Sequence, residues 1–453
     1  SIYESNSNNI FNAIEAGFID VSCSEFDNKT DLQNAINLLP NNDGSTFNGY
    51  SPINTWKFTS NLKDMAGLFR DKTTFNSNIS NWNVSNVTSM ALMFDNAQTF
   101  NQDISGWNTS NVADMAYMFK NAKDFNQPIN TDGDKWNVVN VKDMEAMFLR
   151  AEEFNQNISY WNTSNVYDFG SMFENASSFD QDISGWDTGN VKTMRYMFDG
   201  ATSFNQDISQ WDVSAVTNFT GMFRNAGNFN QDISGWDTGK VNTMQNMFNG
   251  AGNFNIDISQ WDISNVNNFN NMFNNTISLN VDGNINAYEI LHSYRNNNNF
   301  NGTSAGFTNV SLYQFTSETD LRNAVNQWID HEETAISNYG PINTWLFSSD
   351  LKDMSELFQG ETDFNSNISN WDVSAVTNMT SMFENASSFN RDISNWDTSK
   401  VKSMESMFKD TSFNQNINTN DNKWNVSAVT NMAFMFENAS SFNRDISGWN
   451  THE

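Results

Sequence analysis

The segment FNQDISGWNTSNVADMAYMFKNAKD, residues 100–124, repeats along the chain with a period of about 25 residues. Residues 204–228, FNQDISQWDVSAVTNFTGMFRNAGN, keep the same skeleton. A period of this length is typical of solenoids whose coils each carry one strand and one helix. One tryptophan occupies the same place in each repeat, and we expect these indoles to form the core. They are Trp82, Trp107, Trp136, Trp161, Trp186, Trp211, Trp236, Trp261, Trp371, Trp396, Trp424 and Trp449.

The second half of the repeat has the periodicity of a short α-helix. Its apolar residues recur at intervals of three and four, which places them on one helical face. Asn111 is the expected N-cap, with Asp114 as a partner three residues later. The predicted face consists of Val112, Met115, Met118, Phe119 and Ala122.

The first half of the repeat has the pattern of a short strand. Ile104, Trp107 and Thr109 follow the spacing of the strand in a leucine-rich repeat, with tryptophan and threonine in place of leucines. Strands stack about 4.8 Å apart, whereas helices need about 8–10 Å, so we expect the strands to line a concave face. The predicted fold class is therefore α/β: a curved, right-handed, leucine-rich-repeat-like solenoid of strand–helix coils.

A longer repeat lies on top of the 25-residue one. A shift of 289 residues takes SPINTWKFTSNLKDMAGLF, from Ser51, onto GPINTWLFSSDLKDMSELF, from Gly340. This duplication predicts two tandem copies of one domain. Because the second copy has fewer tryptophan coils, and Ser1 already lies inside the duplicated stretch, we expect a window on a longer tandem protein. The predicted segments are 1–50 (N-terminal segment and first helical cap), 51–281 (first solenoid), 282–340 (linker and second cap) and 341–453 (second solenoid).

Each copy opens with the pattern of an amphipathic helix. Thr30 is the expected N-cap in the first copy, where Pro40 ends the helix, and Thr319 is the expected N-cap in the second. Such a helix covers the open end of a stack of coils. Residues 296–299, rich in asparagine, are the expected linker. The faces predicted to be buried are Leu32, Ala35, Ile36 and Leu39, and Leu321, Ala324, Val325 and Trp328.

The unit F-N-x-D-I-S-x-W-[DN]-[VT]-S-x-V-x-x-M-x-x-M-F, seen at 179–198 and 389–408, resembles the repeat of the BspA-like leucine-rich-repeat surface proteins. That repeat was first catalogued as a mycoplasma domain of unknown function. The resemblance covers about three quarters of the chain. It implies secretion or display at a cell surface, with a role in adhesion, in surface variation or in a structural layer, and it implies no enzyme.

Composition excludes several other classes of protein. The 453 residues include 53 Asp and Glu against 23 Lys and Arg, and a net charge of −30 repels nucleic acid. A single cysteine and three histidines exclude a disulfide scaffold and a Cys/His zinc site. No apolar run approaches the roughly 18–20 residues of a membrane-spanning helix.

Two rows of aspartates recur at the repeat period. Neighbouring carboxylates in a row repel by about 1 kcal/mol in bulk water. We expect them to be solvated and to hydrogen-bond to loop backbone; binding of Ca²⁺, which prefers carboxylate and carbonyl oxygens, is the alternative. One row follows the tryptophans, with Asp187, Asp212, Asp237 and Asp262, and the other precedes them, with Asp182, Asp207, Asp232 and Asp257.

Two further features are candidate sites. The insertion at 130–134 places Asp132 and Asp134 at alternate positions, as calcium loops do, although an ordinary Asx-turn is the favoured interpretation because the sister loop has Asn420 and Asn422 there. Among the Asn-x-Ser/Thr sequons, Asn301 is the best candidate for glycosylation.

These patterns favour a non-enzymatic extracellular or cell-surface repeat protein, used in adhesion or as a structural unit of a surface appendage or filament. Duplication supplies multivalency, so weak contacts add up. The expected partners are further copies of the chain, other surface proteins or glycans, and not nucleic acid. No cofactor is required, with Ca²⁺ as an optional one. The alternative is a binding module that takes a glycan, a peptide or a divalent cation on its concave face.

Overall fold

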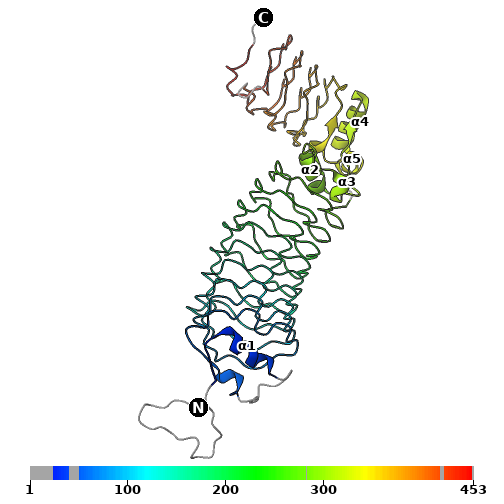
Figure 1. Ribbon diagram of the computed structural model, residues 1–453. Helices are drawn as coiled ribbons and strands as arrows, with labels where there is room; N and C mark the ends of the chain where they lie inside the picture. The colour runs from blue at the N-terminus through cyan, green and yellow to red at the C-terminus, as the bar shows by residue number, and fades with distance from the viewer. Residues whose placement is uncertain (1–23, 40–49, 282, 419–422, 451–453) are drawn as a thin grey trace, which may run out of the picture. The chain divides into compact units, whose positions relative to one another are not determined.

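The computed structural model describes residues 24–39, 50–281, 283–418 and 423–450, and it divides into two compact units. The first unit contains Ser1–Ser278 and Asn297–Gly306, and the second contains Leu279–Asn296 and Phe307–Glu453. Within each unit the chain forms a stack of coils (Figure 1).

Regular helices and strands lie at the ends of the stacks. The first unit has β1 (Glu25–Phe26), α1 (Lys29–Asn37), the 3₁₀-helix η1 (Ile53–Thr55), β2 (Lys57–Phe58) and α3 (Gly302–Ala305). The second has α2 (Ile285–Tyr294), β3 (Gln314–Phe315), α4 (Glu318–Asp330), α5 (Glu332–Tyr339), the 3₁₀-helix η2 (Ile342–Thr344) and β4 (Leu346–Phe347). Strands β1 and β2 pair in parallel, as do β3 and β4. Among the described residues, no helix is long and apolar enough to cross a membrane.

The predicted helix in each coil is wrong. Residues 115–122 instead form three overlapping β-turns, in which the N–H groups of Met118, Lys120 and Ala122 each donate to the carbonyl three residues earlier. Tyr117 and Asn121 have φ values of 60° and 55°, in the left-handed region that an α-helix excludes. The turns bury the same residues as the predicted helical face, because both structures return to the core every three or four residues.

Parallel pairing between coils runs through these turns. The N–H groups of Met115, Tyr117 and Phe119 donate to carbonyls of the next coil, at N···O distances of 3.3, 2.8 and 2.9 Å. Along this segment, backbone N–H groups that donate to the next coil therefore alternate with N–H groups that donate within a turn. Parallel bridges repeat this pairing from Asp64 through every coil to Asn268, and from Asp353 to Asn431 in the second unit. We call this run of hydrogen bonds the turn ladder.

The predicted strand in the first half of the coil is also wrong. Trp107 donates its N–H to Ile104, and Val112 donates to Thr109, so this half consists of two further turns. The predicted curvature rested on different strand and helix spacings, and neither element occurs between residues 59 and 281 or in the described residues after 347. What remains of the predicted fold class is a tandem repeat of stacked coils with helices at the start of each copy.

The core is built from columns of identical side chains. The rings of Trp186 and Trp211 stack with centroids 6.5 Å apart and planes within 2° of parallel. The indole N–H of Trp211 donates to the carbonyl of Ile183 in the preceding coil, at 3.1 Å. Of the twelve tryptophans assigned to the core, eleven are at most 4% exposed. Trp449, in the last described coil, is only partly buried against the core.

Helices α1 and α4 start two residues before the predicted positions. Asn28, not Thr30, caps α1 by accepting from the N–H of Asp31, and Ser317, not Thr319, caps α4 by accepting from Asp320. Helix α1 lies against the first coil, where Gln33 donates to the carbonyl of Leu68 at 3.0 Å. Both helices therefore cover the first coil of their own unit, as the sequence predicted.

The other end of the first stack is covered by residues from beyond the last coil. The carbonyls of Ser304 and Ala305, in α3, accept the N–H groups of Asn271 and Phe273 and so continue the turn ladder. Asn297, in the stretch predicted as a linker, donates its side-chain N–H to the carbonyl of Ile263 at 2.7 Å. Residues 297–306 thus cap the first unit.

Candidate functional site

The side chains that project from the turn ladder form the most varied surface of the first unit. Their positions alternate with the buried methionines and phenylalanines, and we call this surface the ladder face. At the first left-handed position of successive coils the residues are Leu92, Tyr117, Ala146, Ser171 and Tyr196, of which the alanine and the serine are buried and the other three are half-buried. Elsewhere the coils repeat asparagine, serine, threonine and aspartate, so the ladder face is where the coils differ most.

Seven polar side chains gather on the ladder face of the coils between residues 114 and 195. Nη2 of Arg195 lies 2.5 Å from Oε1 of Glu145, which belongs to a coil two steps earlier. The hydroxyl of Tyr167 donates to Oδ2 of Asp143 at 3.5 Å. We call this group the Glu145 cluster; it comprises Asp114, Tyr117, Asp143, Glu145, Tyr167, Asp168 and Arg195.

Glycine makes the central ion pair of this cluster possible. Gly170 occupies the coil between Glu145 and Arg195, and a Cβ there would lie 3.3 Å from both Cγ and Nε of Arg195 and 2.9 Å from Oδ1 of Asp168. A side chain at residue 170 would therefore obstruct the arginine as it crosses the intervening coil.

In the Glu145 cluster, burial and neighbouring carboxylates disfavour the ionised form of the acidic side chains. Burial raises the pKa of Asp143 and Asp168, and neighbouring carboxylates, including Glu145, raise both further. Burial, followed by the hydrogen bond and the charge of Glu145, raises the pKa of Tyr117. Within the cluster one arginine faces four carboxylates, and Nζ of Lys120 lies 5.5 Å from the ring centroid of Tyr117 at its edge. The excess of carboxylates favours a cationic partner.

Ion pairs elsewhere on the ladder face join neighbouring coils. Asp95 is only 3% exposed and lies 3.2 Å from Nε of Arg70 and 3.8 Å from Nζ of Lys120, on the coils either side of it. Asp199, 2% exposed, accepts from Nε of Arg224 at 2.9 Å. Buried charges are tolerated when paired in this way. We interpret these pairs as structural.

The aspartates that precede the tryptophans form hydrogen bonds within their own coils. Each carboxylate accepts from the N–H of the serine two residues later, at 2.9–3.0 Å, in an Asx-turn. Hydrogen bonds from these serines lower the pKa of Asp182, Asp207 and Asp232. The aspartates of this row are Asp182, Asp207, Asp232 and Asp257.

The aspartates that follow the tryptophans have similar partners. Asp187, Asp212, Asp237 and Asp262 accept from the N–H two residues later, at 2.9–3.1 Å. The main-chain carbonyls of Asp187, Asp212 and Asp262 accept threonine hydroxyls from the preceding coil. Within the described ranges, no three His, Cys, Asp or Glu side chains come together as metal ligands. Binding of Ca²⁺ to either row stays a prediction.

The insertion at 130–134 forms a small exposed hairpin. Asp132 and Lys135 exchange backbone hydrogen bonds of 3.1 Å, and Nζ of Lys135 lies 3.7 Å from Oδ2 of Asp132. Gly133, between Asp132 and Asp134, has a φ of 61°, which suits the tight turn. Asn420 and Asn422 of the sister loop lie outside the described residues.

Asn301 is exposed and caps α3, with its side-chain oxygen accepting from the N–H of Ser304 at 2.9 Å. The amide nitrogen, to which a glycan would be attached, is not part of this bond. Glycosylation there stays a prediction.

The sequence interpretation missed the Glu145 cluster. It assigned residues 112–122 of the repeat to a helix and placed its candidate sites in the aspartate rows, the insertion at 130–134 and Asn301. The available signal was the variation from coil to coil at the positions of Tyr117 and Glu145, in a repeat whose other positions vary little.

Stacked coils, a 25-residue period and a duplicated unit define a tandem-repeat protein. The family described as "Mycoplasma protein of unknown function, DUF285" matches residues 38–133, 129–227, 206–315, 319–423 and 412–453, and the chain belongs to this family. No curated protein matches the chain.

Among solved structures, the crystal structure of a TLR13–ssRNA13 complex is similar at 9% identity. The match covers 87% of this chain and 50% of that one, with a TM-score of 0.19. The chain thus spans about half the length of the chain that it matches.

Proposed function

We propose that this chain is a non-enzymatic, extracellular repeat protein of the BspA-like kind, which attaches to other surfaces or assembles into a surface structure through its ladder faces. The supporting observation is that the two copies share their core and differ in what they display. Met65 and Met354 are equivalent and both buried, whereas the exposed position five residues later is Arg70 in one copy and Gln359 in the other. A constant scaffold that carries different side chains is typical of repeat proteins that recognise partners.

The charge of the Glu145 cluster indicates the kind of contact. Four carboxylates, two tyrosines and one arginine favour a partner surface that presents lysine or arginine. Two copies on one chain make the attachment multivalent, so the individual contacts need only be weak.

Attachment of beads coated with the full chain to monolayers of cultured epithelial cells, and to one another, tests this proposal. The variant Glu145→Gln with Asp168→Asn removes two charges from the cluster and should reduce attachment at least several-fold. The matched control, Asp187→Asn with Asp212→Asn, removes two charges from a row away from the ladder face and should leave attachment unchanged. Equal attachment by all three proteins would contradict the proposal.

The same assay separates the alternatives. The proposed function requires no cofactor, so EDTA should not change attachment. If the aspartate rows bind Ca²⁺, EDTA and the Asp187→Asn, Asp212→Asn variant should both weaken it. A soluble chain that saturates with one free glycan or peptide, and whose beads do not attach, would favour the binding-module alternative.

A further inference from the structure

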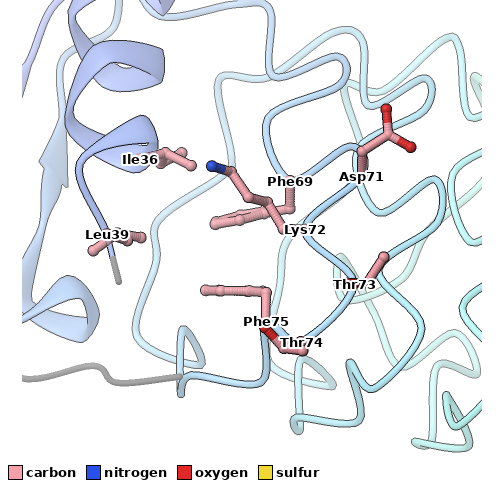
Figure 2. Close-up of a pocket in the computed structure, with 8 residues that line it drawn as sticks. All are labelled: Ile36, Leu39, Phe69, Asp71, Lys72, Thr73, Thr74 and Phe75. Carbon is pink, nitrogen blue, oxygen red and sulfur yellow. The ribbon is translucent and has the colours of Figure 1, made fainter. Parts of the chain in front are cut away.

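Tyr160 presents an exposed aromatic ring in the first half of its coil, outside the ladder face. It is 73% exposed, whereas Trp161, directly after it, is 2% exposed. Most other aromatic rings of the chain lie in the buried columns. Even the two rings that line the pocket between α1 and the first coil, Phe69 and Phe75, are 0% and 8% exposed (Figure 2). Among the described residues, therefore, Tyr160 is one of the few rings that a ligand can reach.

The positions on either side of Tyr160 leave its ring accessible. Gly185 is the equivalent residue of the next coil, and no atom outside its chain neighbours lies within 4 Å of the place of a Cβ there. In the preceding coil the equivalent residue is Lys135, which closes the hairpin at 130–134. Tyr160 thus lies between a bare stretch of backbone and a polar hairpin.

Hydrogen bonds hold the hairpin beside the coil of Tyr160. Oδ1 of Asn130, at the base of the hairpin, accepts the backbone N–H of Tyr160 at 3.0 Å. On its other side the hairpin pairs with the preceding coil, through a bridge between Lys135 and Asn108. The side chains of Asp132 and Lys135 are 86% and 54% exposed. A carboxylate and an ammonium group are therefore available next to the tyrosine.

The surroundings of Tyr160 suit a sugar better than a protein surface. The centre of a protein–protein interface is a contiguous apolar patch. Between residues 125 and 203, all of which the structure describes, the only other exposed large apolar side chain is Tyr167, which belongs to the Glu145 cluster. A sugar ring can place its C–H groups on the face of one aromatic ring, which carries partial negative charge, while its hydroxyls hydrogen-bond to polar groups around it.

We propose that Tyr160 and the hairpin at 130–134 form a binding site for a neutral glycan, in which one sugar unit stacks on the tyrosine ring. The exposed carboxylates of Asp132 and Asp134, and the net charge of −30, disfavour an acidic sugar. Gly448 occupies the equivalent position in the second copy, so we expect one such site per chain. A single open platform binds weakly, and many chains displayed together would strengthen the attachment.

A glycan array probed with the full chain, followed by saturation-transfer NMR on the glycans that bind, tests this inference. We expect neutral oligosaccharides to bind, and their sialylated or sulfated counterparts to bind several-fold less. Tyr160→Gly introduces the residue that the second copy has at this position, so it should leave the unfolding midpoint nearly unchanged while binding falls about tenfold. Tyr160→Phe keeps the ring and should retain binding, whereas Tyr160→Leu should lose it as Tyr160→Gly does.

Two controls separate this site from the rest of the surface. Tyr167→Thr removes an exposed tyrosine from the same coil, puts there the residue type of the equivalent position two coils later, and should leave glycan binding unchanged. The variant Glu145→Gln with Asp168→Asn should also bind glycan as the parent does, which separates this site from the ladder face. Absence of saturable binding to any neutral glycan, equal binding by Tyr160→Gly, or a preference for sulfated glycans would overturn the inference.

Discussion

The guanidinium of Arg195 crosses the coil that contains Gly170 and pairs with Glu145, at 2.5 Å between Nη2 and Oε1. The two residues are 50 positions apart in sequence, which is two coils of the stack. The pairs that Asp95 forms with Arg70 and Lys120, and Asp199 with Arg224, join adjacent coils. This pair therefore spans three coils, and it depends on the absence of a side chain in the middle one.

A double-mutant cycle of Arg195→Met and Glu145→Gln should measure a coupling of about 0.5–1 kcal/mol in the free energy of unfolding. The value is modest because the side chains are 40% and 22% exposed, so water screens their attraction. Chemical unfolding of the four proteins gives the coupling, and high salt should reduce it.

The control for this coupling is the same cycle in a Gly170→Ala background. The added methyl group would crowd Cγ and Nε of Arg195, so the coupling should fall towards zero. A coupling that survives both the alanine and high salt would mean that the pair does not pass over residue 170 as described.

Replacing Trp211 with alanine should destabilise the first unit by about 3–5 kcal/mol. The indole is 3% exposed, stacks on its neighbours and donates a hydrogen bond to Ile183. Trp449→Ala is the matched control and should cost clearly less, because that indole is only partly buried. Equal losses, measured by chemical unfolding, would contradict the difference in burial between the two positions.

The repeat, the duplication, the buried columns and the capping helices could all be predicted from the sequence, because each depends on hydrophobic spacing alone. The conformation within the coil could not. Met115, Met118 and Phe119 have the spacing of a helical face, and overlapping turns bury the same three residues. The distinguishing signal was weak: glycine or asparagine recurs at positions such as Gly67 and Asn121, which adopt positive φ.

The candidate site was less predictable than the fold. Glu145 and Arg195 are equivalent residues two coils apart, and the backbone pairing of the turn ladder sets these coils close enough for the arginine to reach the glutamate. Helices packed about 8–10 Å apart would put the two positions about 16–20 Å apart.

The second unit should lose stability as pH falls from about 6.5 to about 4. His292 in α2 is 5% exposed, and burial, followed by the nearby charge of Arg295, lowers its pKa from 6.5 to about 4. Because the unfolded chain takes up the proton more readily than the folded one, protonation favours unfolding in this window, by up to about 3 kcal/mol.

Hydrogen exchange of the amides of residues 285–294, measured at pH values between 7 and 4.5 after correction for the intrinsic rate, follows this effect. Aspartates whose pKa is lowered in the folded protein also reduce the stability of the fold on acidification, so a control is needed. His292→Gln removes the titrating group and should flatten the pH dependence of these amides relative to the rest of the unit. An unchanged profile in that variant would assign the effect to the carboxylates.

Two glycines at the same place in different coils separate backbone strain from crowding. Gly67 and Gly221 have φ values of 68° and 62°, but only at Gly221 would a Cβ collide with a neighbour, at 2.5 Å from Cδ1 and Cε1 of Tyr196. Gly67→Ala should therefore lower the free energy of unfolding by about 1 kcal/mol, the penalty for a residue with a side chain in the left-handed conformation. Gly221→Ala should cost about 1–3 kcal/mol more, because the tyrosine ring must move.

In a Tyr196→Ser background that excess should disappear, since serine already occupies this column at Ser171. Chemical unfolding of the single and double variants measures the difference, and an excess that persists without the ring would show that Tyr196 does not lie over Gly221.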